Sequence, residues 1–174
     1  MRIFGLAGWS GSGKTTLATR LLPALIRHGV SVSTLKHAHH DFDVDQEGKD
    51  SWRHRQAGAH EVMVASDRRW ALMRELRGAP EPTMDEILRH MSPVDLVLVE
   101  GYKRGPHPKL EVYRAALGKT LLADEDETIV AIASDMPVPG VCLPFFDLDD
   151  IEAIASFVIA HCRLQVVEDG AAQR

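Results

Sequence analysis

The sequence predicts a three-layer α/β fold in which a mostly parallel central sheet is flanked by helices. Segments typical of strands and helices alternate along the 174 residues, as in strand–helix–strand units. The run VDLVLVEG, residues 94–101, is almost continuously apolar, as expected of a central parallel strand buried on both faces. A glycine-rich stretch separates the first predicted strand from the first predicted helix. We therefore expect one domain over residues 1–163, followed by a flexible tail over 164–174.

The N-terminal part contains a predicted strand–helix–strand unit. Residues 2–7 form a short apolar segment, and residues 14–28 carry leucines at helical spacing. Pro23 lies inside the helical segment, so a kink or an early end is expected there. Gly29 suits the cap that follows the helix. Residues 30–37 then alternate in the manner of a strand.

The remaining elements are predicted from apolar spacing and turn residues. Further strands are expected at 61–66, 68–73, 108–114, 128–134 and 141–146, and further helices at 49–58, 84–91 and 151–162. Thr83 is expected to cap the second of these helices, with Glu86 at the spacing of a capping box. Asp147 or Asp149 is expected to cap the last helix, and Trp70 is expected in the core.

Composition and charge restrict the classes of function. The chain has a net charge of −5 and no strongly basic half, which argues against sequence-independent binding of nucleic acid. It has no apolar run of about 18 residues, and the short N-terminal apolar run is not a signal peptide. A cytoplasmic protein with no membrane association is therefore expected. Cys142 and Cys162 lack metal-site spacing and are expected to be buried free thiols.

The glycine-rich stretch, GWSGSGKT, matches the phosphate-loop pattern GxxxxGK[ST], or Walker A, from Gly8 to Thr15. Glycines let the backbone curl so that successive N–H groups point at phosphate oxygens. The lysine supplies charge for the β- and γ-phosphates, the threonine hydroxyl is a ligand for Mg²⁺, and the following helix adds the positive end of its dipole. The motif therefore predicts a P-loop NTPase fold with a nucleotide site. The expected contacts are Gly11, Ser12, Gly13, Lys14, Thr15 and Thr16.

A phosphate loop needs an acidic partner for its metal ion. The apolar strand at 94–101 ends in Glu100 and Gly101, and a carboxylate at the carboxyl end of such a strand falls beside the loop. Glu100 and Thr15 are therefore the predicted metal residues, with Glu100 binding Mg²⁺ directly or through water. A solvated carboxylate at a strand end is the alternative.

The loop after the second strand, HAHHDFDVDQEGKD, carries an unusual set of polar residues. The members able to bind metal are His37, His39, His40, Asp41, Asp43, Asp45 and Asp50. The histidines suit zinc or nickel, and Asp43 or Asp45 suits Mg²⁺ or a substrate. A solvated polar loop is the third interpretation, and the sequence leaves all three open.

Smaller signals accompany these motifs. Lys109 and Arg114 flank the apolar residues of a predicted strand, where they serve either an anionic ligand or an exposed strand end. Asp135 follows the strand VAIAS, at the kind of position where a nucleotide base is read. The guanine-reading sequence NKxD is absent, so the motifs leave the base undetermined.

Several blocks of sequence, taken together, resemble the MobB family of molybdopterin-guanine dinucleotide biosynthesis adapter proteins. These blocks are GWSGSGKTTL, LKHAHHDFDVDQEGKDSWRHRQAGA, ASDRRWALM, DLVLVEGYK and VAIASD, and the resemblance covers roughly residues 1–163. It implies a homodimer that binds GTP and Mg²⁺, hydrolyses GTP weakly at most, and assists a MobA-type guanylyltransferase in joining GMP to molybdopterin. It assigns Gly11, Gly13, Lys14, Thr15 and Thr16 to phosphate and Mg²⁺, and Glu100 to the metal. The guanine preference follows from the resemblance alone.

Two alternatives from other classes remain at this point. A P-loop kinase or ligase acting on a small molecule, similar to dethiobiotin synthetase, also ends a strand in Glu-Gly. A metallochaperone GTPase of the nickel-insertion type would use the histidines of the loop. All three readings rely on Lys14 to neutralise phosphate charge.

Overall fold

The computed structural model describes residues 1–38, 42–102 and 105–166. The chain divides into two compact units, of which the first comprises Met1–His39 and Pro93–Arg174, and the second comprises His40–Ser92. The predicted tail at 164–174 lies mostly outside the described residues, so the domain boundaries drawn from the sequence stay a prediction.

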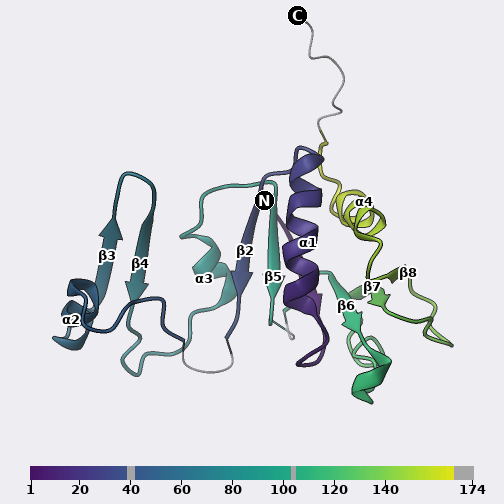
Figure 1. Ribbon diagram of the computed structural model, residues 1–174, viewed down its shortest axis with the longest axis horizontal. Coiled ribbons are helices and arrows are strands. Elements are labelled where there is room, and N and C mark those ends of the chain that lie inside the picture. The colour runs from purple at the N-terminus through teal and green to yellow at the C-terminus, as the bar shows by residue number, and fades with distance from the viewer. Residues whose placement is uncertain (39–41, 103–104, 167–174) are drawn as a thin grey trace, which may run out of the picture. The chain divides into compact units, whose positions relative to one another are not determined.

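The first unit is built on a six-stranded sheet with the order β2-β5-β1-β6-β7-β8. Its strands are β1 (Arg2–Ala7), β2 (Val32–Lys36), β5 (Leu96–Glu100), β6 (Lys109–Tyr113), β7 (Ile129–Ser134) and β8 (Phe145–Asp147). Every neighbouring pair is parallel, which confirms the predicted parallel sheet (Figure 1). The last strand is shorter than the predicted 141–146 and begins only at Phe145.

Two helices, α1 (Lys14–Arg27) and α4 (Ile151–Cys162), pack against each other and against the sheet (Figure 1). The core they form contains apolar side chains that alternate along the strands, including Phe4, Leu6, Leu96, Leu98, Leu110 and Val112. Burying each such leucine or phenylalanine contributes roughly 1.5–3 kcal/mol. Helix α1 runs through Pro23, so the expected early end is wrong. Pro23 lies on the exposed face, where water can replace the hydrogen bond that proline removes.

On the other face of the sheet, buried polar side chains of β6 and of the residues before it pack tightly against β1. The His107 ring lies on Gly5, where any Cβ would stand 2.7 Å from His107 Nε2. Lys109 is buried, and its ammonium donates hydrogen bonds to the Gly105 carbonyl, the Thr128 hydroxyl and the Asp126 carboxylate. The interpretation of Lys109 as a ligand contact or an exposed strand end is therefore wrong, because residues before and after β6 enclose its side chain.

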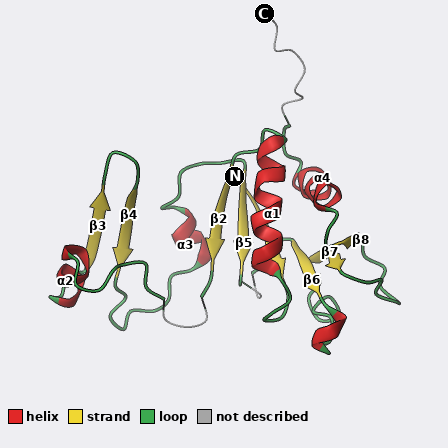
Figure 2. Ribbon diagram, in the orientation of Figure 1, coloured by secondary structure: helices red, strands yellow, loops and turns green. Residues whose placement is uncertain are grey.

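The second unit holds α2 (Asp50–Gln56), the antiparallel hairpin of β3 (Glu61–Ala65) and β4 (Trp70–Arg74), and α3 (Met84–Leu88), as Figure 2 shows. Thr83 and Glu86 form the predicted capping box. Trp70 is 63% exposed, so its placement in the core is wrong. The hairpin presents this residue on a face that the described residues leave open to solvent.

Two further expectations require correction. Asp150 caps α4 by accepting a hydrogen bond from the Ala153 N–H, in place of the expected Asp147 or Asp149. Asp149 instead pairs with Arg20 on α1, at 2.6 Å. Cys162 is buried as expected, but Cys142 is exposed.

Candidate functional site

The parallel sheet gathers the chemistry-bearing residues at one edge. Because all six strands point the same way, the segments that follow them meet at their carboxyl ends. Across this edge, Lys36 ends β2, Glu100 ends β5, the glycine-rich loop follows β1, Arg114 follows β6 and Asp135 follows β7. The loop therefore stands between an acidic group on one side and an arginine–aspartate pair on the other.

The loop between β1 and α1 has the backbone that its glycines were predicted to allow. Gly8, Gly11 and Gly13 have φ angles of 142°, 81° and 98°, which side chains rarely adopt. A Cβ at Gly8 would also stand 2.5 Å from the Val112 carbonyl oxygen. The Ser12 side chain is buried beneath the loop, and its hydroxyl makes no hydrogen bond to the described residues.

Helix α1 begins at this loop with its first turn open to an anion. Gly13 is its N-cap, no side chain among the described residues caps it, and its first turn contains no acidic residue. Its N–H groups and the positive end of its dipole are thus available to phosphate oxygens. Lys14 stretches back over the loop, with its ammonium 2.9 Å from the carbonyl oxygens of Gly8 and Trp9. Thr16 lies exposed in the same first turn.

Glu100 lies directly beside the loop. The Thr15 hydroxyl donates to the Glu100 carboxylate, with distances of 3.0 Å to Oε1 and 3.3 Å to Oε2. The Lys36 ammonium lies 3.9 Å from the same Oε1. A threonine hydroxyl and a carboxylate are oxygen ligands of the type that Mg²⁺ prefers, and the remaining positions are left for water and phosphate. The chemistry of this donor set therefore fits a magnesium–nucleotide complex.

On the opposite side, Arg114 ties the loop to the end of β7. Its Nε donates to the Ser12 carbonyl at 3.1 Å, and its Nη1 donates to the Asp135 carboxylate at 2.8 Å. The sequence marked both residues as weak signals, but nothing in the sequence joined them. The contact arises because β6 and β7 are neighbours in the sheet and end at the same edge.

A second contact to the loop was missed by sequence reasoning. The Trp9 indole N–H donates to the Thr120 carbonyl at 2.8 Å, and the Lys119 ammonium lies 5.7 Å from the centroid of the Trp9 ring. Lys119 and Thr120 follow the short 3₁₀ helix η1 (Ala115–Leu117), which was not predicted from the sequence. The segment after β6 thus supports the outer side of the phosphate loop.

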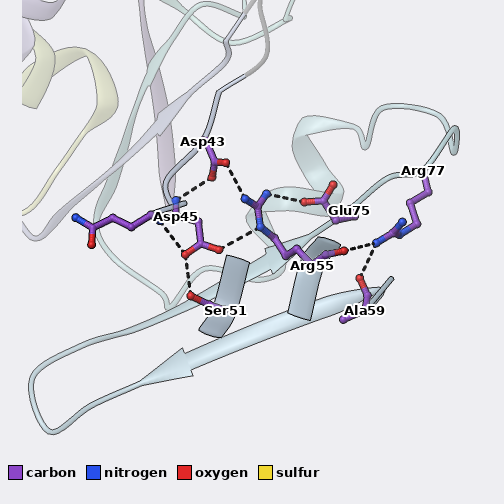
Figure 3. A network of polar contacts seen from close by, with 8 residues as sticks. Asp43, Asp45, Ser51, Arg55, Ala59, Glu75 and Arg77 are labelled. Carbon is purple, nitrogen blue, oxygen red and sulfur yellow. Dashed lines mark hydrogen bonds and ion pairs between the residues drawn. The ribbon is translucent and has the colours of Figure 1, made fainter. Parts of the chain in front are cut away.

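Asp43 and Asp45 of the DFDVD segment are engaged within the second unit, where Arg55 on α2 contacts both (Figure 3). The Arg55 guanidinium contacts Asp43 at 2.7 Å, Asp45 at 3.2 Å and Glu75 at 2.9 Å. The Asp45 N–H and the guanidinium lower the pKa of the Asp43 carboxyl. Through Arg55, α2 is thus tied to Asp43 and Asp45 on one side and to Glu75, the residue after β4, on the other.

The histidine cluster is described only in part. The His37 N–H donates to the Glu100 carbonyl, and the His37 ring lies 4.9 Å from the Tyr102 ring. His39, His40 and Asp41 lie outside the described residues. Among the residues that are described, no three His, Cys, Asp or Glu side chains come together as a metal site.

A phosphate loop after the first strand of a parallel sheet, with a carboxylate at the end of the neighbouring strand, defines the P-loop nucleotide-binding fold. The family model of MobB, "Molybdopterin guanine dinucleotide synthesis protein B", matches residues 3–135. The chain belongs to this family.

Relatives and solved structures agree with this assignment. The chain is 42% identical over 159 residues to the molybdopterin-guanine dinucleotide biosynthesis adapter protein of Haemophilus influenzae, covering 90% of this chain and 86% of the relative. It is 40% identical over 168 residues to the adapter protein of Escherichia coli, covering 94% of each. A crystal structure of molybdopterin-guanine biosynthesis protein B superimposes with a TM-score of 0.72 and 30% identity, covering 91% of this chain and 99% of that one.

None of the helices in the described part of the chain is long and apolar enough to cross a bilayer.

Proposed function

We propose that this protein is a GTP-binding adapter of molybdopterin-guanine dinucleotide biosynthesis, which assists a MobA-type guanylyltransferase in attaching GMP to molybdopterin. The observation that carries the nucleotide part is the contact between Thr15 and Glu100 beside the phosphate loop. The names of the relatives, all adapter proteins of this pathway, support the pathway part. A cytoplasmic location belongs to the same proposal.

The proposed nucleotide complex uses residues that already have suitable geometry. The N–H groups of Gly11, Ser12, Gly13, Lys14, Thr15 and Thr16 surround the phosphates, and the Lys14 ammonium exchanges its two carbonyl partners for phosphate oxygens. The Thr15 hydroxyl would bind Mg²⁺ directly, and Glu100 would bind it directly or through water. Bound Mg²⁺ would neutralise charge on the β- and γ-phosphates.

An adapter role requires the protein to bind GTP but does not require it to hydrolyse GTP quickly. Efficient hydrolysis needs a group that orients the attacking water, and the one carboxylate shown beside Thr15, among the described residues, is Glu100. Because Glu100 serves the metal in this proposal, GTP hydrolysis by the isolated protein is expected to be weak, well below the median enzyme rate of about 10 s⁻¹.

We further propose that the protein is a homodimer and that the β3–β4 hairpin is its contact surface. The register places Met63 opposite Leu72 and Ala65 opposite Trp70, so these side chains share one face. Met63 is 62% exposed and Trp70 is 63% exposed. Isolated two-stranded hairpins are marginally stable in water, so this apolar face would gain from burial against the same face of a second copy.

The proposal is tested by reconstitution. A purified MobA-type guanylyltransferase, molybdopterin and MgGTP are incubated with and without this chain, and molybdopterin-guanine dinucleotide is quantified by chromatography. The chain is expected to raise product formation and to co-purify with the enzyme. Equal product formation with and without the chain would contradict the adapter role, and calorimetry without any heat for MgGTP would contradict the nucleotide role.

A further inference from the structure

Asp135 has no part in the phosphate and metal contacts described above, yet it is tied to the phosphate loop. Its side chain is 39% exposed and follows β7, which is separated from β1 only by β6. Arg114, which follows β6, donates both to the Asp135 carboxylate and to the Ser12 carbonyl in the loop. An exposed carboxylate is thereby held at a fixed offset from the phosphate loop.

The position of the proposed metal site indicates in which direction a bound triphosphate runs across the phosphate loop. Mg²⁺ would neutralise charge on the terminal phosphates, and Thr15 and Glu100, the residues that would hold it, lie on the β5 side of the loop. The terminal phosphates therefore face β5. The α-phosphate and the nucleoside then leave on the opposite side of the loop, above the ends of β6 and β7, where Arg114 and Asp135 lie.

We propose that Asp135 is the residue that selects guanine, by accepting hydrogen bonds from the N1–H and the 2-amino group of the base. This inference rests on the proposed function, because it requires a nucleotide on the phosphate loop. A carboxylate offers only acceptors, and guanine presents two adjacent donors at this edge. Adenine presents one donor beside the N1 acceptor, which the carboxylate repels. The two carboxylate acceptors of Asp135 therefore match guanine, the base that the NKxD motif recognises. That motif is absent from this sequence.

Arg114 acts as the positioning residue in this arrangement. Its Nη1 contacts Oδ2 of Asp135, and a carboxylate has enough lone pairs to accept from the base as well. Its Nε holds the loop at Ser12, 3.1 Å away. The same planar, rigid guanidinium thus sets the separation between the phosphate loop and the residue proposed to contact the base.

The test exchanges the hydrogen-bonding pattern of residue 135. Asp135→Asn offers one acceptor and one donor, which complement the N1–H and the 2-carbonyl oxygen of xanthine. Calorimetry measures the affinities of the wild type and the variant for MgGTP, MgXTP and Mg-tripolyphosphate. We expect the variant to lose GTP affinity by about 10- to 100-fold, to prefer XTP, and to bind tripolyphosphate like the wild type. Asp149→Asn is the matched control, since Asp149 is also an exposed carboxylate paired with an arginine.

The outcomes separate this inference from the proposed function. If Asp135→Asn binds GTP as tightly as the wild type does, Asp135 does not read the base, although nucleotide binding stands. Equal losses for GTP, XTP and tripolyphosphate would likewise overturn the inference, because they would indicate a structural role for the pair with Arg114. A wild-type protein that binds tripolyphosphate and MgGTP with equal affinity would refute base recognition, and one that binds neither would refute the proposed function itself.

Discussion

The hydroxyl of Thr15 donates to the carboxylate of Glu100 at 3.0 Å, although 85 residues separate the two in the chain. The contact joins the first turn of α1 to the end of β5 and is possible because β1 and β5 are parallel neighbours. Through it, the two halves of the proposed metal site are already in contact.

Glu100→Gln tests the metal role of this pair. Glutamine keeps the shape of the side chain and can still accept from Thr15, but it lacks the negative charge that attracts Mg²⁺. We expect the gain in GTP affinity on adding Mg²⁺ to fall by about tenfold or more, with magnesium-free binding unchanged or tighter. Calorimetry with Mg²⁺ and with EDTA measures this. Glu152→Gln, an exposed carboxylate paired with Arg27, serves as control. An unaltered magnesium dependence would remove Glu100 from the metal site.

Lys14→Ala tests the phosphate loop. The lysine lies over the loop and contributes little to the core, so the melting temperature is expected to change little. Loss of charged contacts to phosphate is expected to weaken GTP binding by more than about tenfold and to abolish stimulation of the guanylyltransferase. Calorimetry, thermal unfolding and the reconstituted assay provide the measurements, and exposed Lys49→Ala is the control. Wild-type GTP affinity in Lys14→Ala would count against the nucleotide site.

Arg55→Met tests the network in Figure 3. Methionine preserves much of the apolar stem but leaves Asp43, Asp45 and Glu75 without their common cation. Repulsion among the three carboxylates is expected to loosen α2 and the segment before it. Hydrogen exchange over residues 42–77 should therefore accelerate relative to wild type. Arg53→Met, at an exposed position of the same helix, is expected to leave exchange unchanged. Equal protection in both variants would show that the network adds no local stability.

The buried ring of His107 leads us to expect that the protein becomes less stable at mildly acidic pH. Burial, followed by the charge of Lys109, lowers the pKa of the His107 ring to about 4, from the usual 6.5. The unfolded chain therefore binds an extra proton between pH 6.5 and pH 4, so stability is full above pH 6.5 and falls as the pH drops through this window. Thermal melts from pH 7 to pH 4 should show this fall in the wild type and a flatter profile in His107→Gln. His90→Gln, at an exposed position, should keep the wild-type slope. The same slope in His107→Gln would assign the acid sensitivity to other groups.

Met63→Lys tests the proposed dimer surface. A charge at the centre of the apolar hairpin face is costly to bury, so the variant is expected to be monomeric at concentrations where the wild type is dimeric. Light scattering coupled to size-exclusion chromatography measures the mass. Val64→Lys places the same charge on the opposite face of the hairpin and is expected to remain dimeric. A dimeric Met63→Lys protein would move the interface elsewhere.

Local patterns in the sequence predicted those features that depend only on residues close together in the chain. The capping box of Thr83 and Glu86 spans four residues, and the glycines of the phosphate loop adopt the backbone that only glycine readily allows. Glu100 could also be placed, because a buried parallel strand must end near its neighbours. Nucleotide contacts of these residues stay a prediction.

Features that depend on tertiary contacts could not be read in this way. Lys109 looks exposed in sequence, yet the Gly105 carbonyl, the Asp126 carboxylate and the Thr128 hydroxyl surround its ammonium. Trp70 looks like a core residue, but the hairpin turns it outward. Asp150 caps α4, while Asp149 pairs with Arg20 on another helix. The Asp126 partner of Lys109 lies 17 residues away and the Arg20 partner of Asp149 lies 129 residues away, so neither contact leaves a local pattern.

The route of the chain from β2 to β5 limits how the protein can be shortened. These strands are parallel neighbours, so the polypeptide leaving Lys36 must travel back along the sheet before it can enter Leu96. Such a return needs a dozen residues or so and is impossible for a tight turn. A truncated protein that omits residues 40–92 would therefore fold only if a linker of comparable reach took their place. Residues 40–92 thus form a separate compact unit and also provide the connection that lets β2 join the sheet.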